Sequence, residues 1–183
     1  MGQLKALLPW HGVTLLEHQI RSLIDDAVYR VVVVLGYQAN RLKPVVESVD
    51  GAHWVLNDDY LEGKTTSIKS GVSDLIISQT RHVVLLSVDQ PRRSDTVRTL
   101  LERHTSSFSK MSIPTYRGRG GHPIIMSASV LSEVMKIEEE TQGLLEVVRR
   151  HAGETSRFEI DDPSLVWDLN TAEQYQQALD ADL

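Results

Sequence analysis

The sequence contains no cysteine, only 5% aromatic residues, six prolines and no long hydrophobic run. The absence of cysteine excludes disulfide scaffolds, thiolate zinc sites and cysteine nucleophiles, and it favours a cytoplasmic location. Because no apolar stretch approaches about 18 residues, we expect no membrane insertion. The chain also lacks a block of lysine and arginine, and its net charge is −6. These features argue against nucleic-acid binding and predict that any bound phosphates belong to a small molecule.

The chain has 183 residues, of which 41% are apolar, and this predicts one globular domain over residues 1–183. In its first half, helical spacing alternates with β-branched runs. A capping box of Thr14 and Glu17 opens the first predicted helix. Pro44 fits the second helix only near its first turn. We predict helices at 14–27, 40–49 and 65–78, and strands at 30–35, 53–56 and 83–88.

The second half predicts a helix capped by Ser94, followed by a polar loop, HTSSFSK. Thr171 and Gln174 form a second capping box, which opens a C-terminal helix. Between them we predict strands at 111–116, 122–126, 157–160 and 165–167, and helices at 130–137 and 144–151. Strands that alternate with helices predict an α/β fold, specifically a three-layer α/β/α sandwich.

Ligands of open parallel sheets bind beyond the carboxyl ends of the strands. Asp89 follows the run VVLLSV directly, so we expect its carboxylate at the rim of the sheet. That is a suitable position for a metal ligand. The alternative is a turn-forming or helix-capping aspartate, which is common before a proline.

The segment NDDYLEGKTTSIKSG, residues 57–71, combines a glycine, hydroxyls and two lysines at the start of a predicted helix. Backbone amides, helix dipole and lysine charge together suit phosphate oxygens. Alternatively, Thr65 and Thr66 only cap the helix, and Lys64 and Lys69 are solvated.

Arg117, Arg119 and His122 lie in a glycine-rich loop, RGRGGHP, that can bind an anionic second substrate. The alternative is a flexible surface loop. We interpret His18 and His104 as structural, because no histidine pair has the spacing of a zinc site. No nucleophile elbow is present, and Glu138–Glu140 are predicted to be a solvated helix end.

Taken together, these segments and KALLPWHGVTLLEHQI, VVVVLG, VVLLSVDQP, YRGRGGHPI and WDLNTAEQY resemble the nucleotidyltransferase family that contains molybdenum cofactor cytidylyltransferase. The resemblance spans nearly the whole chain. It implies a Rossmann-like nucleotidyltransferase fold with a mostly parallel sheet. It also implies transfer of a nucleoside monophosphate from a nucleoside triphosphate to a phosphorylated small-molecule acceptor, here molybdopterin, with Mg²⁺ and release of pyrophosphate. The DQP form of the third motif favours CTP, and the product would be delivered to a molybdoenzyme.

The resemblance also assigns site residues. Asp89 matches the magnesium-binding aspartate, Lys5 the lysine that neutralises triphosphate charge, and Asn170 the second metal ligand. The predicted nucleotide-binding residues are Asn57, Gly63, Ser67 and Gly71. The predicted acceptor-binding residues are Gly118, Arg119, Gly121, His122 and Pro123.

The sequence departs from the family pattern at several positions. Asn170 replaces an aspartate, and the loss of one negative charge should weaken metal binding. Arg92 stands where an apolar residue is usual.

The family's usual first strand and glycine-rich loop are missing, because the chain begins at the end of that signature. We expect the strands at 30–35 and 83–88 to lack a shared partner. We also hypothesise that the native product begins about a dozen residues upstream, enough for one strand and a loop.

Two other readings stay open. One is a cytidylyl or uridylyl transferase that acts on a sugar phosphate or an alcohol phosphate. The other is a catalytically inactive module that binds a cofactor or a partner protein. A dinucleotide-binding domain is disfavoured because no G-x-G-x-x-G follows a strand.

Overall fold

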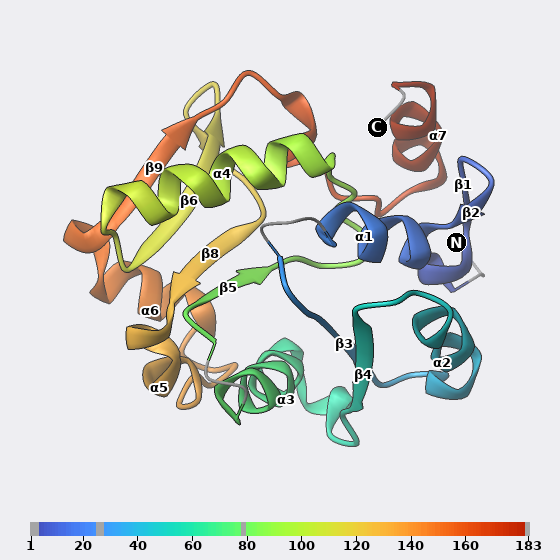
Figure 1. Ribbon diagram of the computed structural model, residues 1–183, viewed down its shortest axis with the longest axis horizontal. Coiled ribbons are helices and arrows are strands. Elements are labelled where there is room, and N and C mark those ends of the chain that lie inside the picture. Colours follow the sequence, from blue (N-terminus) through green and yellow to red (C-terminus); the bar gives the residue numbers. More distant parts are fainter. Residues whose placement is uncertain (1–3, 25–27, 78–79, 182–183) are drawn as a thin grey trace.

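The computed structural model describes residues 4–24, 28–77 and 80–181 (Figure 1). The predicted ends at Ala27 and Ser78, and the residues before Leu4, lie outside these ranges. Two β-sheets form the centre of the molecule. In the first, β3 (Val31–Leu35) pairs in parallel with β4 (Ala52–Leu56). The second contains β5 (His82–Leu85), β8 (Ile124–Ser127), β6 (Met111–Tyr116) and β7 (Arg119–Gly120), with β9 (Thr155–Glu159) on β6.

The pairings of the second sheet are mixed. β9 runs parallel to β6, whereas β8 runs antiparallel to both β5 and β6. This reversal follows from the hairpin between β6 and β7, which turns the chain back before β8 begins. A small antiparallel pair, β1 (Pro9–Trp10) and β2 (Val13–Thr14), lies near the N-terminus.

Helices cover both faces of the sheets, and the alternation of strand side chains shows how. In β5 and β8, Val83 and Met126 face one core, whereas Val84 and Ile125 face the other. The first core is closed by α3 (Lys64–Ile77), α5 (Leu131–Val134) and α6 (Leu144–Arg150). The second is closed by α4 (Ser94–Ser107). The predicted three-layer, Rossmann-like fold is therefore confirmed.

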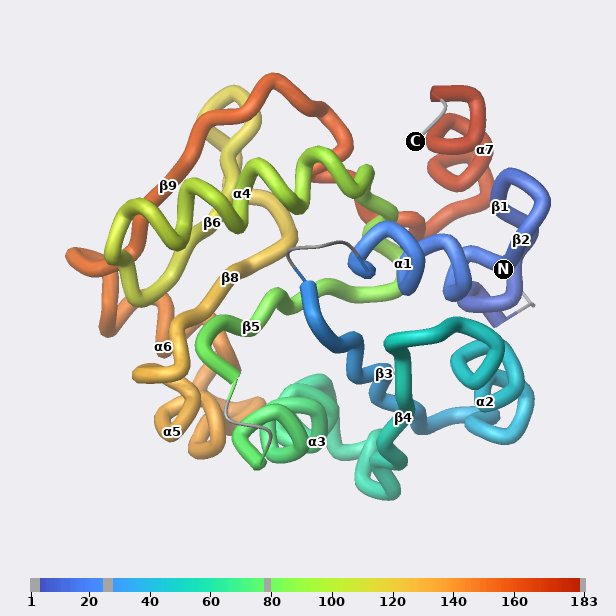
Figure 2. The backbone as a smooth tube through the Cα atoms, viewed as in Figure 1, coloured from blue at the N-terminus to red at the C-terminus, as the bar shows by residue number. Residues whose placement is uncertain are grey.

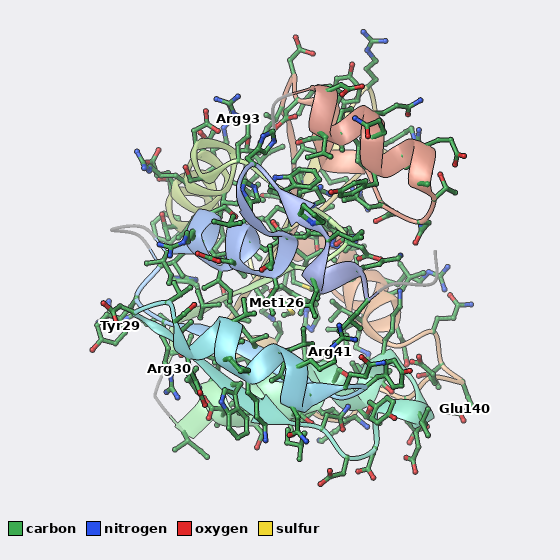
Figure 3. The ribbon with its side chains drawn as sticks, turned by 90° about the vertical axis from the view of Figure 1, so that its right-hand side faces the viewer. Tyr29, Arg30, Arg41, Arg93, Met126 and Glu140 are labelled. Atoms are coloured by element: carbon green, nitrogen blue, oxygen red, sulfur yellow. The ribbon has the colours of Figure 1, made fainter. Side chains whose placement is uncertain are left out.

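A third core joins α1 (Leu15–Leu23) and α2 (Ala39–Glu47) to β3. Figure 3 shows Met126 inside the molecule, whereas the labelled Tyr29 extends outward and is 98% exposed. At the other end of the chain, α7 (Ala172–Asp180) lies beside the N-terminal segment (Figure 2). Tyr175 of α7 donates a hydrogen bond to the Pro9 carbonyl, and its ring contacts Trp10. The two ends of the chain are thus held together.

Within the described residues, no strand pairs with both β3 and β5, as predicted. Among the strands that the structure describes, β3 pairs with β4 alone, and β5 pairs with β8 alone. The hypothesis of an upstream strand stays a prediction.

The helix caps follow the sequence in part. The Thr14 hydroxyl accepts a hydrogen bond from the Glu17 amide at 3.2 Å, but the Glu17 carboxylate accepts from Arg21 instead of completing the box. At α7, both bonds of the predicted box between Thr171 and Gln174 are present.

Two expectations about helices are wrong. Pro44 is the sixth residue of α2, well beyond the first turn. The first four residues of HTSSFSK belong to α4, and the N-cap of this helix is Arg93, not Ser94. The hydroxyls of Thr105, Ser106 and Ser107 satisfy carbonyls within the helix.

Two predicted strands also differ. Residues 163–166 form a 3₁₀ turn, η5 (Pro163–Val166), instead of a strand. Asp162 caps this turn by accepting from the Ser164 amide, and proline at its start favours helical geometry. β5 ends at Leu85, so Asp89 follows the strand by four residues and not directly.

In the described part of the chain, no helix is long and apolar enough to cross a membrane.

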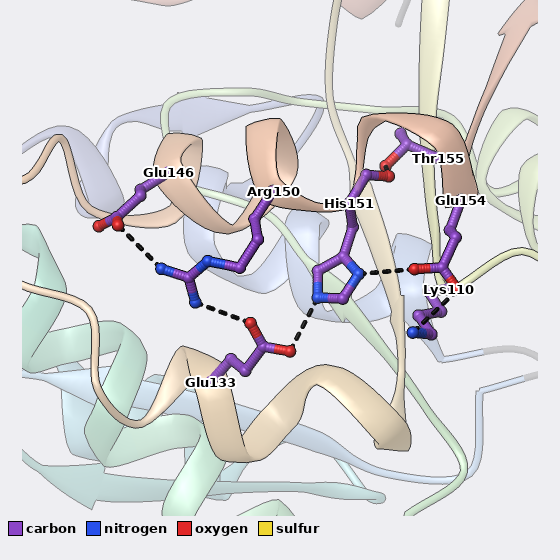
Figure 4. Close-up of polar contacts among 7 residues, drawn as sticks. All are labelled: Lys110, Glu133, Glu146, Arg150, His151, Glu154 and Thr155. Carbon is purple, nitrogen blue, oxygen red and sulfur yellow. Dashed lines mark hydrogen bonds and ion pairs between the residues drawn. The ribbon is translucent and has the colours of Figure 1, made fainter.

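A polar cluster holds α5, α6 and the start of β9 together (Figure 4). The half-exposed Glu133 of α5 accepts hydrogen bonds from His151 and Arg150, both at 2.8 Å. The second nitrogen of His151 contacts Glu154 at 2.9 Å, and Glu154 also pairs with Lys110. Hydrogen bonds to Glu154 and Glu133 raise the pKa of His151 above its ordinary value of 6.5.

This raised pKa predicts a pH-dependent contribution to stability. The contribution of His151 is complete below pH 6.5 and is lost as the pH rises through the folded-state pKa. We therefore expect the urea midpoint of His151→Gln to lie below that of the wild type at about pH 6, and the gap to narrow by about half or more at about pH 9.

His104 provides the control of opposite sign. Burial lowers its pKa to about 4, so its contribution is present above pH 6.5 and lost as the pH falls toward 4. The difference in urea midpoint between wild type and His104→Gln should therefore become smaller as the pH is lowered. If the difference in urea midpoint between wild type and His151→Gln stays constant or grows as the pH rises, the raised pKa of His151 is contradicted.

Candidate active site

Three side chains from distant parts of the sequence meet at one point. The Lys5 ammonium lies 3.2 Å from Asp89 Oδ2 and 2.8 Å from Asn170 Oδ1. Lys5 opens η1 (Lys5–Leu7), Asp89 lies beyond β5, and Asn170 directly precedes the cap of α7. The Lys5 and Asp89 side chains are each about 30% exposed, at 32% and 28%. The predicted catalytic lysine and the two predicted metal ligands thus form one group that is open to solvent.

The turn that carries Asp89 is held rigidly from α1. The buried Gln19 side chain donates to the Ser87 carbonyl at 3.1 Å and to the Gln90 carbonyl at 2.8 Å. Its own oxygen accepts from the Arg92 amide at 3.2 Å. One side chain thus makes three hydrogen bonds to residues 87–92. These bonds fix the backbone that carries the Asp89 carboxylate.

The segment that carries Asn170 is tied to the same turn. Gln90 donates to Asp168 at 2.6 Å, and the Leu169 amide donates to the Asp89 carbonyl at 2.8 Å. The Asn170 amide itself donates to the Gln174 side chain at 2.8 Å. These bonds set the separation between the Asp89 and Asn170 oxygens.

The oxygens of Asp89 and Asn170 fit a divalent cation. Both contact one ammonium already, so a cation can reach both without a change of fold. Mg²⁺ is usually bound by one or two carboxylates together with waters and substrate phosphates. No group of three or more histidine, cysteine, aspartate or glutamate side chains is placed for a metal among the described residues. A metal here would therefore take further ligands from substrate.

The predicted acceptor loop is bonded to the segment that leads to Asn170. The His122 amide donates to the Leu165 carbonyl at 2.9 Å, and the peptide between His122 and Pro123 is cis. Gly121 is buried so closely that an added Cβ would stand 2.2 Å from the Leu165 oxygen. Gly121 and Pro123 thus shape the loop, and the half-buried His122 side chain is the part that a ligand can reach.

Charged residues of several other segments act on the pKa of His122. Burial, then the Arg92 charge and the Lys64 charge, lower the pKa of His122, whereas Asp168 and Asp89 act in the opposite direction. Its Nδ1 atom is buried and has no hydrogen-bond partner in the structure. A lowered pKa keeps His122 neutral at pH 7.

The outer part of the predicted acceptor loop lies at a hairpin tip. Gly118 has a φ of +75° with open space around it, and Arg119 is exposed on β7. No recorded contact joins Arg119 to Lys5, Asp89 or Asn170. Its role toward an acceptor stays a prediction.

The predicted nucleotide segment is ordered by its own hydrogen bonds. Asn57 is buried and donates to Thr66 at 2.9 Å and to Ser67 at 3.0 Å. Gly71 lies against β3, where an added Cβ would come within 3.0 Å of Val34. Asn57 and Gly71 therefore order this segment, and the nucleotide contacts of Asn57, Gly63, Ser67 and Gly71 stay a prediction.

The N-terminus of α3 holds an anion from the chain itself. The Glu139 carboxylate accepts from the Lys64 amide at 2.8 Å, and an added Cβ on Gly63 would meet the same carboxylate at 2.5 Å. Residues 138–140 are exposed, as predicted, and Glu139 makes this contact in addition. The contact agrees with the prediction that this helix start attracts negative charge.

Sequence reasoning missed Gln19, Gln90 and Asp168 and gave Arg92 no role. Gln19 had a detectable signal, because it is a polar residue on the apolar face that Leu16 and Ile20 define. The other three follow from loop geometry, which residue spacing does not encode.

Comparisons with known proteins show the family of this chain. A family model described as the MobA-like NTP transferase domain matches residues 1–155. A curated relative, molybdenum cofactor cytidylyltransferase of Escherichia coli K12, is 27% identical over 96% of this chain and 86% of its own length. Nicotine blue oxidoreductase of Paenarthrobacter nicotinovorans is 28% identical over 96% of this chain and 87% of its own length.

Among solved structures, Rv0371c of Mycobacterium tuberculosis H37Rv in complex with manganese superposes with a TM-score of 0.73 at 20% identity. The match covers 97% of this chain and 91% of that chain. At this identity the likeness shows the fold alone. Since the family model covers most of the chain, the protein belongs to the MobA-like NTP transferase family and is a nucleotidyltransferase.

Proposed function

We propose that this nucleotidyltransferase moves cytidine monophosphate from CTP to the phosphate of molybdopterin, with Mg²⁺ and release of pyrophosphate. The observation that carries the proposal is the convergence of Lys5, Asp89 and Asn170, where Arg92 bonds the segments of Asp89 and Asn170 to the His122 loop. The cytidylyltransferase of E. coli supports the choice of CTP and of the acceptor. The manganese complex of Rv0371c supports a divalent metal. Delivery of the product to a molybdoenzyme and a cytoplasmic location stay predictions.

The reaction needs no covalent enzyme intermediate. An oxygen of the acceptor phosphate attacks the α-phosphorus of CTP, the new phosphorus–oxygen bond forms, and the bond to the β-phosphate breaks as pyrophosphate leaves. When bound, Mg²⁺ supplies charge neutralisation at the phosphate oxygens. The chain must therefore align two anionic substrates and lower their mutual repulsion.

Each residue of the group has a part in that alignment. Asp89 and Asn170 present the oxygen ligands, and Lys5 adds a cation whose flexible stem reaches from these oxygens toward a phosphate. His122, kept neutral by its lowered pKa, is the half-buried side chain of the proposed acceptor loop. The rigid turn from Ser87 to Arg92 limits the movement of Asp89 between turnovers.

A second function has support from one relative. Nicotine blue oxidoreductase shares 28% identity with this chain, so the fold also carries a protein named for redox chemistry. Transfer is favoured because no dinucleotide-binding glycine motif follows a strand of this sequence. Release of pyrophosphate from CTP, compared with oxidation of NADPH in the same preparation, separates the two functions. A panel of molybdopterin, sugar phosphates and alcohol phosphates then identifies the acceptor.

The first prediction for the site concerns Asp89→Asn, which keeps the shape of the side chain and removes its charge. We expect pyrophosphate release to fall by about 100-fold or more, since the charge that holds the metal is lost. The urea midpoint should be unchanged within error. Asp161→Asn, at an exposed position outside the site, serves as the control and should retain wild-type turnover. Turnover of Asp89→Asn within about twofold of wild type would remove Asp89 from the mechanism.

The second prediction concerns Asn170→Asp, which restores a second carboxylate. We expect the Mg²⁺ concentration for half-saturation in the presence of CTP to fall by about tenfold, because a second negative charge joins the cation site. Isothermal titration calorimetry measures this directly. The matched control is Asn40→Asp, on the exposed face of α2. Equal or weaker Mg²⁺ affinity in Asn170→Asp would show that this side chain is not a metal ligand.

A further inference from the structure

Arg92 is a fully buried arginine at the centre of the loops around the site. Its exposure is 0%, and the recorded hydrogen bonds of its guanidinium all end on backbone carbonyls. Nε donates to the His122 carbonyl at 2.9 Å, and one terminal nitrogen donates to the Pro91 carbonyl at 2.7 Å. The other terminal nitrogen donates to Leu165 at 3.0 Å and to Trp167 at 3.3 Å.

A buried charge of this kind is costly, and the carbonyl hydrogen bonds and more distant carboxylate charges offset part of that cost. Burial lowers the pKa of Arg92 to about 10, while the charges of Asp162, Asp168 and Asp89 act to raise it. Arg92 therefore stays protonated at neutral pH. An apolar side chain of similar size would remove the buried charge, but it would leave four carbonyls without their donor.

The carbonyls that Arg92 binds belong to three different segments. Pro91 is in the turn that carries Asp89, His122 is in the acceptor loop, and Leu165 with Trp167 leads to Asn170. The planar guanidinium directs its five N–H donors in fixed directions, so it fixes the three segments relative to one another. A lysine has three donors on one atom and cannot reproduce this geometry.

We propose that Arg92 is a positioning residue that sets the distance between the acceptor loop at His122 and the metal-ligand pair Asp89 and Asn170. Its side chain is fully buried and donates four hydrogen bonds to protein carbonyls, so it acts through the loop and does not touch substrate. The consequence for acceptor binding rests on the proposed function, whereas the effect on the loop itself does not.

Hydrogen exchange measures the effect on the loop without reference to activity. The relevant amides are those of His122, which bonds to Leu165, and Leu169, which bonds to Asp89. In Arg92→Met, peptides that contain these amides should exchange about tenfold faster or more, while the β3–β4 ladder exchanges as in wild type. Arg92→Lys should restore part of the protection. Unchanged exchange at His122 and Leu169 would overturn the proposal.

Steady-state kinetics with CTP, Mg²⁺ and molybdopterin test the consequence for the reaction. We expect the KM for molybdopterin to rise by about tenfold or more in Arg92→Met, with the KM for CTP within about twofold of wild type. An equal rise in both KM values would show a merely structural role and contradict the proposal.

Gly121→Ala is the second variant, in case Arg92→Met does not fold. It displaces the same loop from Leu165 and leaves the buried charge in place, so the same selective rise in KM is expected. Gly153→Ala, where an added Cβ meets no atom within 4 Å, is the matched control and should behave as wild type. If wild-type protein transfers nothing to molybdopterin, the proposed function fails, and the exchange result still decides the role of Arg92.

Discussion

Two oxygen atoms, one on Asp89 and one on Asn170, share a single cation in this structure, the ammonium of Lys5. The rest of the site depends on keeping these oxygens close, because two such groups from distant segments do not converge by chance. Gln19 holds the turn of Asp89 from one side, and Gln90 ties that turn to Asp168 on the other. These hydrogen bonds hold the backbone on both sides of the cation-binding oxygens. A reaction between two anionic substrates needs such a fixed arrangement.

Much of the fold could be predicted from the sequence. The β-branched run that became β3 and the capping box of α7 are local signals, and both are confirmed. The resemblance to a family with one more strand predicted that no strand is shared by β3 and β5, and none of the described strands is. The errors arose where tertiary contacts override local pattern. HTSSFSK reads as a loop, but buried His104 contacts Ser112 at 2.7 Å and keeps its segment in α4.

In the candidate site too, some residues could be predicted from the sequence and others could not. Lys5, Asp89 and Asn170 could be assigned because each lies in a motif, and the structure brings them together. Arg92 could not be assigned a role, since its importance lies in three carbonyl-bearing segments that only the fold assembles. Glu139 was also missed as a partner of α3, because 75 residues separate it from Lys64. Sequence spacing reports what is local, whereas these contacts depend on topology.

The central claim is that Asp89 and Asn170 bind one divalent metal beside a nucleotide. Anomalous diffraction from a crystal grown with CTP and Mn²⁺ tests it most directly. The account predicts a manganese peak within coordination distance of both side-chain oxygens, with the Lys5 ammonium displaced toward the phosphates. A crystal that shows bound CTP and a manganese ion away from Asp89 would contradict it.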